Sequence, residues 1–194
     1  EQVKEAVAPY AEQVAIAVYN GPQHFVVSGA SEAVEKLVQD LAARKIETRR
    51  LVVGQASHSP LMAPILDEFE RIAAGIQLRK PQLRLISNVS GVEAGEEIAT
   101  ARYWRDHLAQ PVRFADSLRT LQELRYQHFL EIGPQPMLIG IGRRCLTGDD
   151  LTWLPSLRTG HNDLESMFDS LGALYTHGFN IDWTGFERPF GERS

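Results

Sequence analysis

The chain has 194 residues, of which 43% are hydrophobic and 23% charged, a composition typical of a folded globular protein and not of a disordered chain. Its 25 acidic residues outnumber its 20 basic ones, and no basic run exceeds a pair, so a nucleic-acid partner is not predicted. No apolar stretch reaches the roughly 18–20 residues that cross a bilayer, and the single cysteine cannot form an internal disulfide, so we expect a cytoplasmic protein without a membrane contact.

Residues 1–53 predict a small subdomain with the element order α-β-β-α-β. In chain order we expect a helix at residues 1–8, strands at 14–19 and 24–28 joined by a turn at 20–22, a helix capped by Ser31, and a strand at 48–53. The two strands form a hairpin, because Asn, Gly and Pro separate two short apolar runs. One further strand in front would complete a βαββαβ arrangement, so we predict a ferredoxin-like subdomain whose first strand is missing.

Residues 54–148 alternate between helical and strand patterns. We expect helices at 60–74, 103–108, 114–124 and 137–146, and strands at 83–86 and 128–132. Such alternation is typical of a largely parallel sheet, so the predicted fold class is α/β. Residues 149–194 differ in kind. They predict a short strand at 151–154, a helix at 162–177 that Gly178 ends, and an aromatic tail, together an appendix that packs on the body.

His58 is the strongest candidate functional residue, because it lies where an expected strand gives way to a helix. Ser59 suits the helix cap and Pro60 the first helical position, which places His58 just before the helix N-terminus. The positive end of the helix dipole disfavours imidazolium, so we expect a neutral ring able to accept a proton. A histidine that only forms a hydrogen bond at a helix end explains the same pattern, and spacing alone does not separate the two interpretations.

A nucleophile to match this base is missing, because no Gly-x-Ser-x-Gly elbow occurs in the 194 residues. A local nucleophile, Ser59 or Cys145, is the least favoured interpretation. We expect Ser59 to be committed as a helix cap and Cys145 to be a buried thiol. The sequence shows neither metal-ligand spacing nor a Gly-x-Gly-x-x-Gly after a strand, so neither a metal nor a dinucleotide is predicted.

Four motifs occur together in a characteristic order. They are Tyr19-Asn20-Gly21-Pro22 with Val26-Val27-Ser28-Gly29, then Ala56-Ser57-His58-Ser59-Pro60-Leu61-Met62, then Tyr103-Trp104 through Gln110-Pro111-Val112-Arg113-Phe114, and last Glu131-Ile132-Gly133-Pro134. With this order and spacing the chain resembles the acyltransferase domain of modular type I polyketide synthases, relatives of the malonyl-CoA:acyl carrier protein transacylases. The resemblance implies that residues 54–148 are the C-terminal part of an α/β-hydrolase-like subdomain and that residues 149–194 are the linker that follows it.

The resemblance also implies a ping-pong transfer of an extender unit. In such enzymes a serine on a Gly-His-Ser-x-Gly elbow takes a malonyl or methylmalonyl group from its acyl-CoA and passes it to the phosphopantetheine thiol of an acyl carrier protein. The histidine that acts as general base matches His58. The elbow belongs upstream in the family, so we expect the chain alone to be inactive and to bind no cofactor directly. Expected partners are acyl-CoA, an acyl carrier protein, a neighbouring ketosynthase and the upstream half of the acyltransferase.

Further site residues follow from the same resemblance. In the family a backbone carbonyl orients the histidine, and the matching position here is His107. The alternative interpretation of the His107 side chain is that it faces solvent and is inert. Asn20 matches a position that lines the acyl pocket, although ordinary turn chemistry explains it equally well. Ser57, where malonyl-specific relatives carry Phe, favours an α-substituted extender such as methylmalonyl, while Gln55 replaces the Tyr of the usual motif.

Two other residues and a second function stay open. Asn88 follows a strand end and borders the histidine or caps a loop, and Glu131 is a second acid or a structural carboxylate. The second function is a non-catalytic module that docks a carrier protein or a ketosynthase.

Overall fold

The computed structural model describes residues 1–188 and has the α/β architecture that the sequence predicts. It divides into two compact units, which are described separately. The first holds residues 1–126 with 144–146, and the second holds residues 127–143 with those from 147 onward. The division into three parts at residues 53 and 148 stays a prediction.

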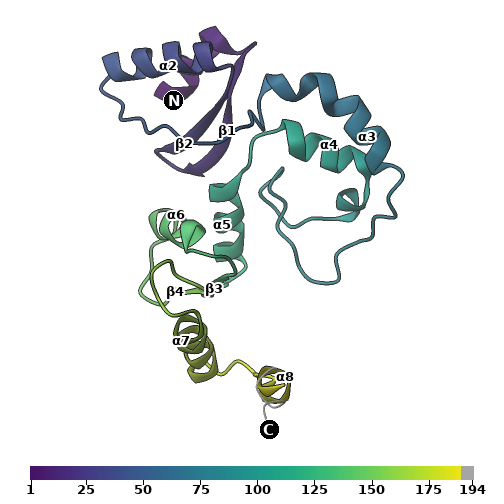
Figure 1. Ribbon diagram of the computed structural model, residues 1–194, viewed down its shortest axis with the longest axis vertical. Coiled ribbons are helices and arrows are strands. Elements are labelled where there is room, and N and C mark those ends of the chain that lie inside the picture. The colour runs from purple at the N-terminus through teal and green to yellow at the C-terminus, as the bar shows by residue number, and fades with distance from the viewer. Residues whose placement is uncertain (189–194) are drawn as a thin grey trace. The chain divides into compact units, whose positions relative to one another are not determined.

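The first unit begins with a hairpin covered by two helices (Figure 1). Its elements are α1 (Gln2–Val7), β1 (Val14–Gly21), β2 (His24–Gly29) and α2 (Ser31–Ala43). The two strands pair antiparallel, and the register shifts twice along the pair. The predicted hairpin and both helices are therefore confirmed, and a short 3-10 helix, η1 (Ala8–Tyr10), follows α1.

A small apolar core holds this layer together. Leu37 on α2 is fully buried and Val14 on β1 is 1% exposed. Apolar side chains from both helices and from β1 complete the cluster, namely Ala6, Val7, Ile16, Ala33 and Leu41. Ser31, expected to cap α2, is instead its first residue. The cap position belongs to Ala30, which offers no side-chain hydrogen bond.

The strand expected at residues 48–53 does not form. This segment has no regular secondary structure, and Val52 and Val53 are exposed. A strand is stabilised by the hydrogen bonds and side-chain contacts of its neighbours, and within residues 1–188 no strand lies beside this segment. The apolar pattern is present, but no strand in residues 1–188 pairs with it.

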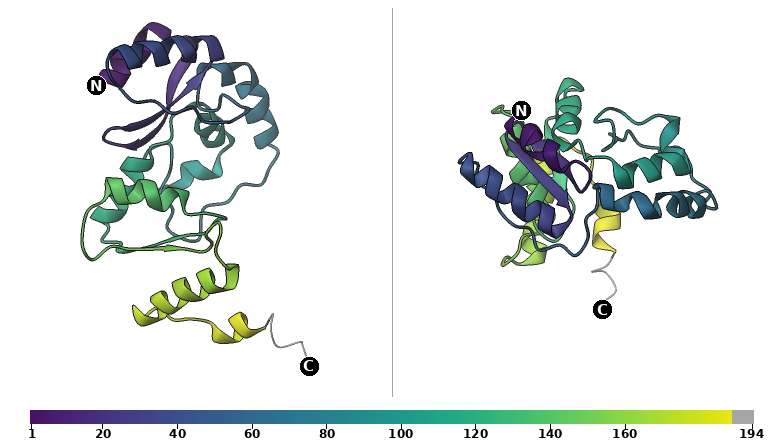
Figure 2. Two further views of the ribbon diagram at one scale, coloured as in Figure 1. Left: turned by 60° about the vertical axis from the view of Figure 1, so that its left-hand side comes forward. Right: turned by 90° about the horizontal axis from the view of Figure 1, so that it is seen from above.

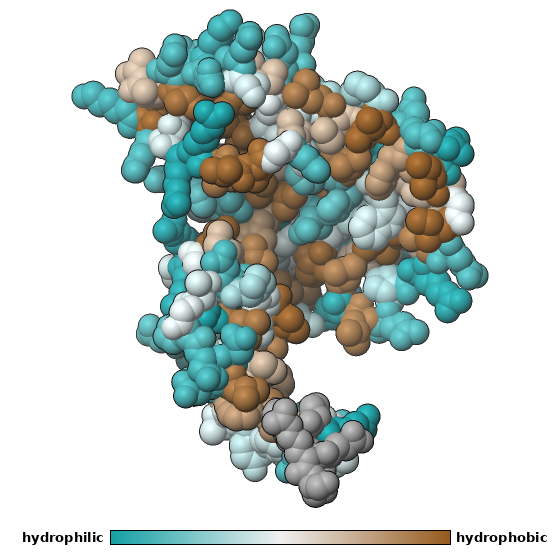
Figure 3. All heavy atoms as spheres, viewed as in Figure 1, coloured by the Kyte–Doolittle hydropathy of each residue, from teal (hydrophilic) through white to brown (hydrophobic). Residues whose placement is uncertain are grey.

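The rest of the first unit is mostly helical. Its elements are the 3-10 helix η2 (Pro60–Ile65), α3 (Leu66–Ala73), the 3-10 helix η3 (Glu96–Ala99), α4 (Ala101–Ala109) and α5 (Phe114–Glu123). Helices α3 and α4 pack side by side (Figures 1 and 2). Apolar side chains remain at the surface on and next to α3, among them Phe69 and Ile72 (Figure 3).

The strand expected at residues 83–86 is also absent as a regular element. Ile86 forms an isolated antiparallel bridge with Glu93, and the Ser87 amide donates to the Val92 carbonyl at 2.8 Å. The chain therefore folds back on itself here. This local pairing uses backbone N–H and C=O groups that a strand of a parallel sheet would need for its neighbours.

The segment between α4 and α5 is tied to the hairpin. The Tyr19 amide donates to the Val112 carbonyl, and the Val112 amide donates to the Ala17 carbonyl, both at 2.8 Å. Val112 and Val18 form a parallel bridge. This pairing fixes the chain directly after α4, which is the part that carries Gln110.

The second unit contains β3 (His128–Glu131) and β4 (Thr152–Pro155), which pair parallel as the α/β pattern predicts. The Phe129 and Trp153 rings stack across the pair with centroids 4.4 Å apart. Most of helix α6 (Met137–Cys145) follows β3 in this unit, while its last two residues belong to the first unit. Helices α7 (Asp163–Thr176) and α8 (Trp183–Glu187) complete the second unit. Gly178, at φ +84°, lies just beyond the end of α7, as expected from its freedom to adopt left-handed backbone.

Candidate active site around His58

His58 lies at a turn between η2 and the irregular segment that follows α2. Its backbone is left-handed, with φ +58°, a conformation that few residues other than glycine adopt. Ser59 is the N-cap of η2, and its hydroxyl accepts from the Leu61 amide at 3.3 Å while donating to the Ala56 carbonyl at 2.6 Å. Both expected features of the helix start, the Ser59 cap and Pro60 at the first position, are confirmed.

Two hydrogen bonds hold His58 against the C-terminal end of α4. Its amide donates to the Leu108 carbonyl at 3.2 Å, and its ring Nδ1 lies 2.8 Å from the Gln110 carbonyl oxygen. Both carbonyls are free for this purpose, because a helix leaves its last carbonyls without internal partners and the Val112 amide, the next donor along the chain for Leu108, bonds the Ala17 carbonyl instead. The end of one helix therefore serves as the acceptor surface for the histidine.

The orienting carbonyl belongs to Gln110, which corrects the expectation that it is that of His107. The chemical consequence is the one expected. A carbonyl oxygen can only accept, so Nδ1 carries the proton, and in the neutral ring Nε2 keeps its lone pair. Strain at φ +58° and a fixed tautomer together describe a preorganised ring rather than a freely rotating surface histidine.

The His107 side chain is not a free, solvent-facing group. It is half-buried, and its ring centroid lies 6.1 Å from that of His58 and 5.7 Å from that of Trp104. Burial, followed by the charge of His58, lowers the pKa of His107 below its ordinary value. A neutral imidazole therefore lies beside the candidate base.

The residues expected to contact substrate have different environments. Ser57 is half-buried next to His58, whereas Gln55 is exposed. Asn20, near the end of β1, is 8% exposed, and its carbonyl accepts from the Cys145 thiol at 2.7 Å. Ser57 is therefore next to the histidine and partly accessible. Asn20 instead belongs to the packed interior of the first unit.

Neither local nucleophile is favoured by its surroundings. Ser59 is 4% exposed and uses its hydroxyl both to donate and to accept within its own turn. Burial raises the pKa of the Cys145 thiol, which disfavours the thiolate that a nucleophile requires. The Ser59 hydroxyl therefore acts as a helix cap, and the Cys145 thiol as a donor to the Asn20 carbonyl.

Asn88 and Glu131 differ in the contacts that they make. The main-chain carbonyl of Asn88 accepts from the Arg113 amide at 2.8 Å, a contact that does not involve its side chain, so the role of that side chain stays a prediction. The Glu131 carboxylate accepts from the amides of Leu138 and Ile139, at 3.0 and 2.8 Å, and so caps the start of α6. For Glu131 the structural alternative therefore has a direct contact in its favour.

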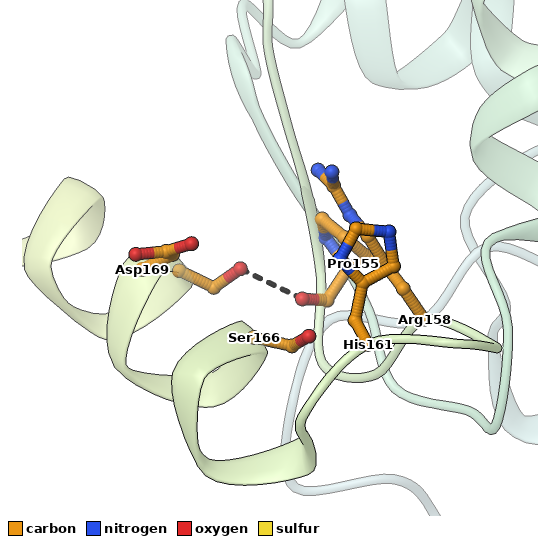
Figure 4. A pocket seen from close by; sticks show the side chains of 6 residues that line it. Pro155, Arg158, His161, Ser166 and Asp169 are labelled. Atoms are coloured by element: carbon orange, nitrogen blue, oxygen red, sulfur yellow. Dashed lines mark hydrogen bonds between the residues drawn. The ribbon is translucent and has the colours of Figure 1, made fainter.

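A small polar pocket lies elsewhere, wholly within the second unit (Figure 4). Its lining is Pro155, Arg158, His161, Ser166, Asp169 and Ser170. The Ser170 hydroxyl donates to the Pro155 carbonyl at 2.7 Å and closes one side. None of the predicted site residues lines it.

Residues 1–188 contain neither a membrane-spanning helix nor a metal-binding cluster. No helix there has both the length and the apolar character that a membrane crossing needs. No group of three or more His, Cys, Asp or Glu side chains in this part of the chain is arranged to hold a metal ion.

The sequence missed Leu108 and Gln110, which supply the acceptors for His58. One signal was available, because Pro111 marks the end of a helix and the last carbonyls of a helix lack internal donors. What the sequence does not show is which distant group those carbonyls would meet. The pairing of His58 with Gln110 joins residues 52 positions apart and depends on the packing of α3 against α4.

Comparison with known proteins identifies the family. The acyl transferase domain family matches residues 1–180. The chain is 41% identical over 182 residues to phenolphthiocerol synthesis polyketide synthase type I Pks15/1 from Mycobacterium bovis, covering 94% of this chain and 9% of that protein. The chain thus spans a small part of the length of such curated relatives.

Solved structures agree. The acyltransferase domain from the second module of the salinomycin polyketide synthase superposes with a TM-score of 0.89 at 34% identity, covering 98% of this chain and 44% of that one. The acyl transferase domain of SpnD in complex with 2-(pent-4-yn-1-yl)malonyl gives 0.83 at 30% identity, covering 90% and 44%. The chain therefore belongs to the acyl transferase domain family, and its relatives are the acyltransferase domains of modular polyketide synthases.

Proposed function

We propose that His58 is the general base of a ping-pong transfer of an extender unit from acyl-CoA to the phosphopantetheine thiol of an acyl carrier protein. In the first half, Nε2 takes the proton of a serine hydroxyl as the oxygen attacks the thioester carbonyl, and that proton passes to the departing coenzyme A thiolate. In the second half, Nε2 takes the proton of the pantetheine thiol as its sulfur attacks the acyl-serine, and the proton returns to the serine oxygen.

One observation carries this proposal, the 2.8 Å contact between His58 Nδ1 and the Gln110 carbonyl. It directs the lone pair to Nε2 without a buried carboxylate, which is what a base that must accept and return a proton requires. The serine is proposed to come from a Gly-His-Ser-x-Gly elbow outside these 194 residues, because none occurs within them. The chain alone is accordingly proposed to be inactive.

The proposed acyl group is an α-substituted malonyl unit such as methylmalonyl. Ser57 precedes His58, and a hydroxymethyl group leaves room that a phenylalanine ring would fill. One extra methyl group in such a pocket changes selectivity by only about 1–3 kcal/mol, so Gln55 and Asn20 are proposed to contribute as well. The related SpnD domain has been crystallised with a malonyl group that carries a long substituent.

Reconstitution tests the base. The chain is combined with the acyltransferase segment that bears the elbow, and self-acylation from methylmalonyl-CoA and from malonyl-CoA is followed by intact mass. We expect the combination to acquire one acyl group, the isolated chain to acquire none, and His58→Ala to abolish acylation. His24, an exposed histidine of the same unit, provides the control, and His24→Ala should acylate normally. Normal acylation by His58→Ala would refute the proposal.

A non-catalytic docking role is the second candidate, and a specific observation favours testing it. Helix α7 leaves Leu164, Met167 and Phe168 exposed, and such apolar groups are typical of surfaces that meet a partner. Capture of an acyl carrier protein by the isolated chain, equally strong for wild type and His58→Ala, together with failed reconstitution, would favour docking over catalysis.

A further inference from the structure

Arg105 is a cation that the proposed reaction does not use. It lies on α4 with only 21% of its side chain exposed, although arginines are usually on the surface. Three carboxylates surround its guanidinium: Asp67 at 3.3 Å, Glu70 at 3.1 Å and Asp106 at 3.6 Å. The Arg105 Nε atom is buried and its N–H forms no hydrogen bond, so Glu70 acts on it as a charge rather than as an aligned acceptor.

These ion pairs differ from the others on the same helices. Arg102 pairs with Asp106 one turn along α4 and is 63% exposed, and Arg71 pairs with Glu68 within α3 and is 70% exposed. Exposed pairs inside one helix contribute at most a few tenths of a kcal/mol. Arg105 instead joins α4 to α3, and its partial burial reduces the screening of its charge by water.

The two helices that Arg105 joins are the two that build the His58 site. The chain runs from His58 through η2 into α3, and α4 ends with the carbonyls of Leu108 and Gln110. A shift of α3 along α4 would therefore move the histidine relative to both of its acceptors. The ion pairs of Arg105 with Asp67 and Glu70 are side-chain contacts between α4 and α3 that oppose such a shift.

We propose that Arg105 is a positioning residue that fixes the His58 ring on the Gln110 carbonyl by locking α3 against α4. The effect of Arg105 on catalysis rests on the proposed function, but its effect on the contact between His58 Nδ1 and the Gln110 carbonyl is measurable without turnover. Without the lock, the bond from Nδ1 to Gln110 is lost for part of the time, and the proton redistributes between Nδ1 and Nε2. Displacements of about 1 Å in catalytic groups cost roughly a hundredfold in rate.

The test uses the full chain labelled with ¹⁵N-histidine, together with Arg105→Gln and the control Arg102→Gln. Ring nitrogen shifts of His58, assigned with His58→Ala, report which nitrogen carries the proton, and amide hydrogen exchange reports the bond to Leu108. We expect wild type and Arg102→Gln to show a protonated Nδ1 and an unprotonated Nε2. We expect Arg105→Gln to show mixed tautomers and about tenfold faster exchange of the His58 amide.

A second pair of variants decides the matter if Arg105→Gln does not fold. Glu70→Gln removes one partner of Arg105, and Glu68→Gln removes a partner of Arg71 on the same helix. We expect Glu70→Gln to shift the His58 tautomer and Glu68→Gln to leave it unchanged. Conservative Arg105→Lys should restore the tautomer only in part, since an ammonium lacks the planar fork.

The outcomes separate this inference from the proposed function. Identical His58 spectra and amide exchange for Arg105→Gln and Arg102→Gln overturn the positioning role, whatever happens to acyl transfer. A tautomer shift in Arg105→Gln supports the role even in a preparation that transfers no acyl group. In reconstituted enzyme, a positioning role lowers kcat with little change in KM and alters the pH profile, whereas a general loss of fold lowers the amount of active enzyme.

Discussion

The hairpin layer and the histidine turn belong to the same unit but are held in place by different forces. In the layer of β1, β2, α1 and α2, Leu37 and Val14 are buried among other apolar side chains. At the turn, His58 is half-buried and is held by bonds to the carbonyls of Leu108 and Gln110. The apolar packing of the layer stabilises the fold, whereas the hydrogen bonds at the turn orient the His58 ring. Substitutions in the two regions should therefore change different observables.

The largest expected effect is on the hairpin layer. Leu37→Ala deletes a fully buried side chain and should lower the free energy of unfolding by about 3 kcal/mol, through lost burial and the cavity left behind. Urea unfolding of this variant measures the loss. Under native conditions its His58 ring shifts should match wild type, because the substitution lies outside the turn. A loss below about 1 kcal/mol, or an altered His58 tautomer, would contradict the separation of the two regions.

The next effect is at the turn itself. Ser59→Ala removes the η2 cap and leaves the Ala56 carbonyl without its donor, so the free energy of unfolding should fall by about 1 kcal/mol. Unlike Leu37→Ala, this variant should also disturb the His58 ring shifts. Ser90→Ala, at an exposed serine with one long hydrogen bond, is the control and should cost less than about 0.5 kcal/mol. Equal results for the two serines would mean that the cap does not organise the turn.

The contrast between the two regions also explains which parts of the fold the sequence predicts. Hairpin and helices in the first 43 residues follow from local patterns, because period-two strands, turn residues and an apolar helical stripe all involve near neighbours. The segments at 48–53 and 83–86 carry the same apolar signal and do not form regular strands. In the first, the described chain offers no partner strand. In the second, the bridge of Ile86 to Glu93 takes over the pairing.

The site divides in the same way. His58 and its Ser59 cap are visible in the sequence, because a cap, a proline and a chemically distinctive residue are consecutive. Gln110 is not visible as an acceptor, because any residue has a carbonyl and only the packing of α3 on α4 decides which one is reached. The environment of His107 likewise depends on burial between elements rather than on its neighbours in sequence.

The effect at His107 depends on pH. Burial holds the pKa of His107 below its value in the unfolded chain, so the unfolded state binds the proton more readily as the pH falls through about 6.5. Above that pH the group is neutral in both states and costs nothing. Below it, stability is lost. His107→Asn removes this titrating imidazole. The decrease in free energy of unfolding between about pH 7.5 and about pH 5.5 should therefore be smaller in the variant than in wild type. A series of urea unfolding curves measures both, and equal slopes would show that burial of this ring does not penalise its charge.

The smallest expected effect is at Val52, and it gives the sharpest contrast with Leu37. Both are apolar residues in segments that the sequence assigns to regular structure, yet Leu37 is fully buried and Val52 is fully exposed. Val52→Thr keeps the side-chain shape and adds a hydroxyl that water can solvate, so in this chain the free energy of unfolding should change by less than about 0.5 kcal/mol. A Val packed inside a sheet would lose well over that amount, because an isosteric hydroxyl in an apolar site lacks a partner. Urea unfolding of the variant therefore tests whether the segment is unpaired in solution. A loss of about 1 kcal/mol or more would mean that residues 48–53 pack against the rest of the chain, and the difference between the two regions would then be smaller than the structure indicates.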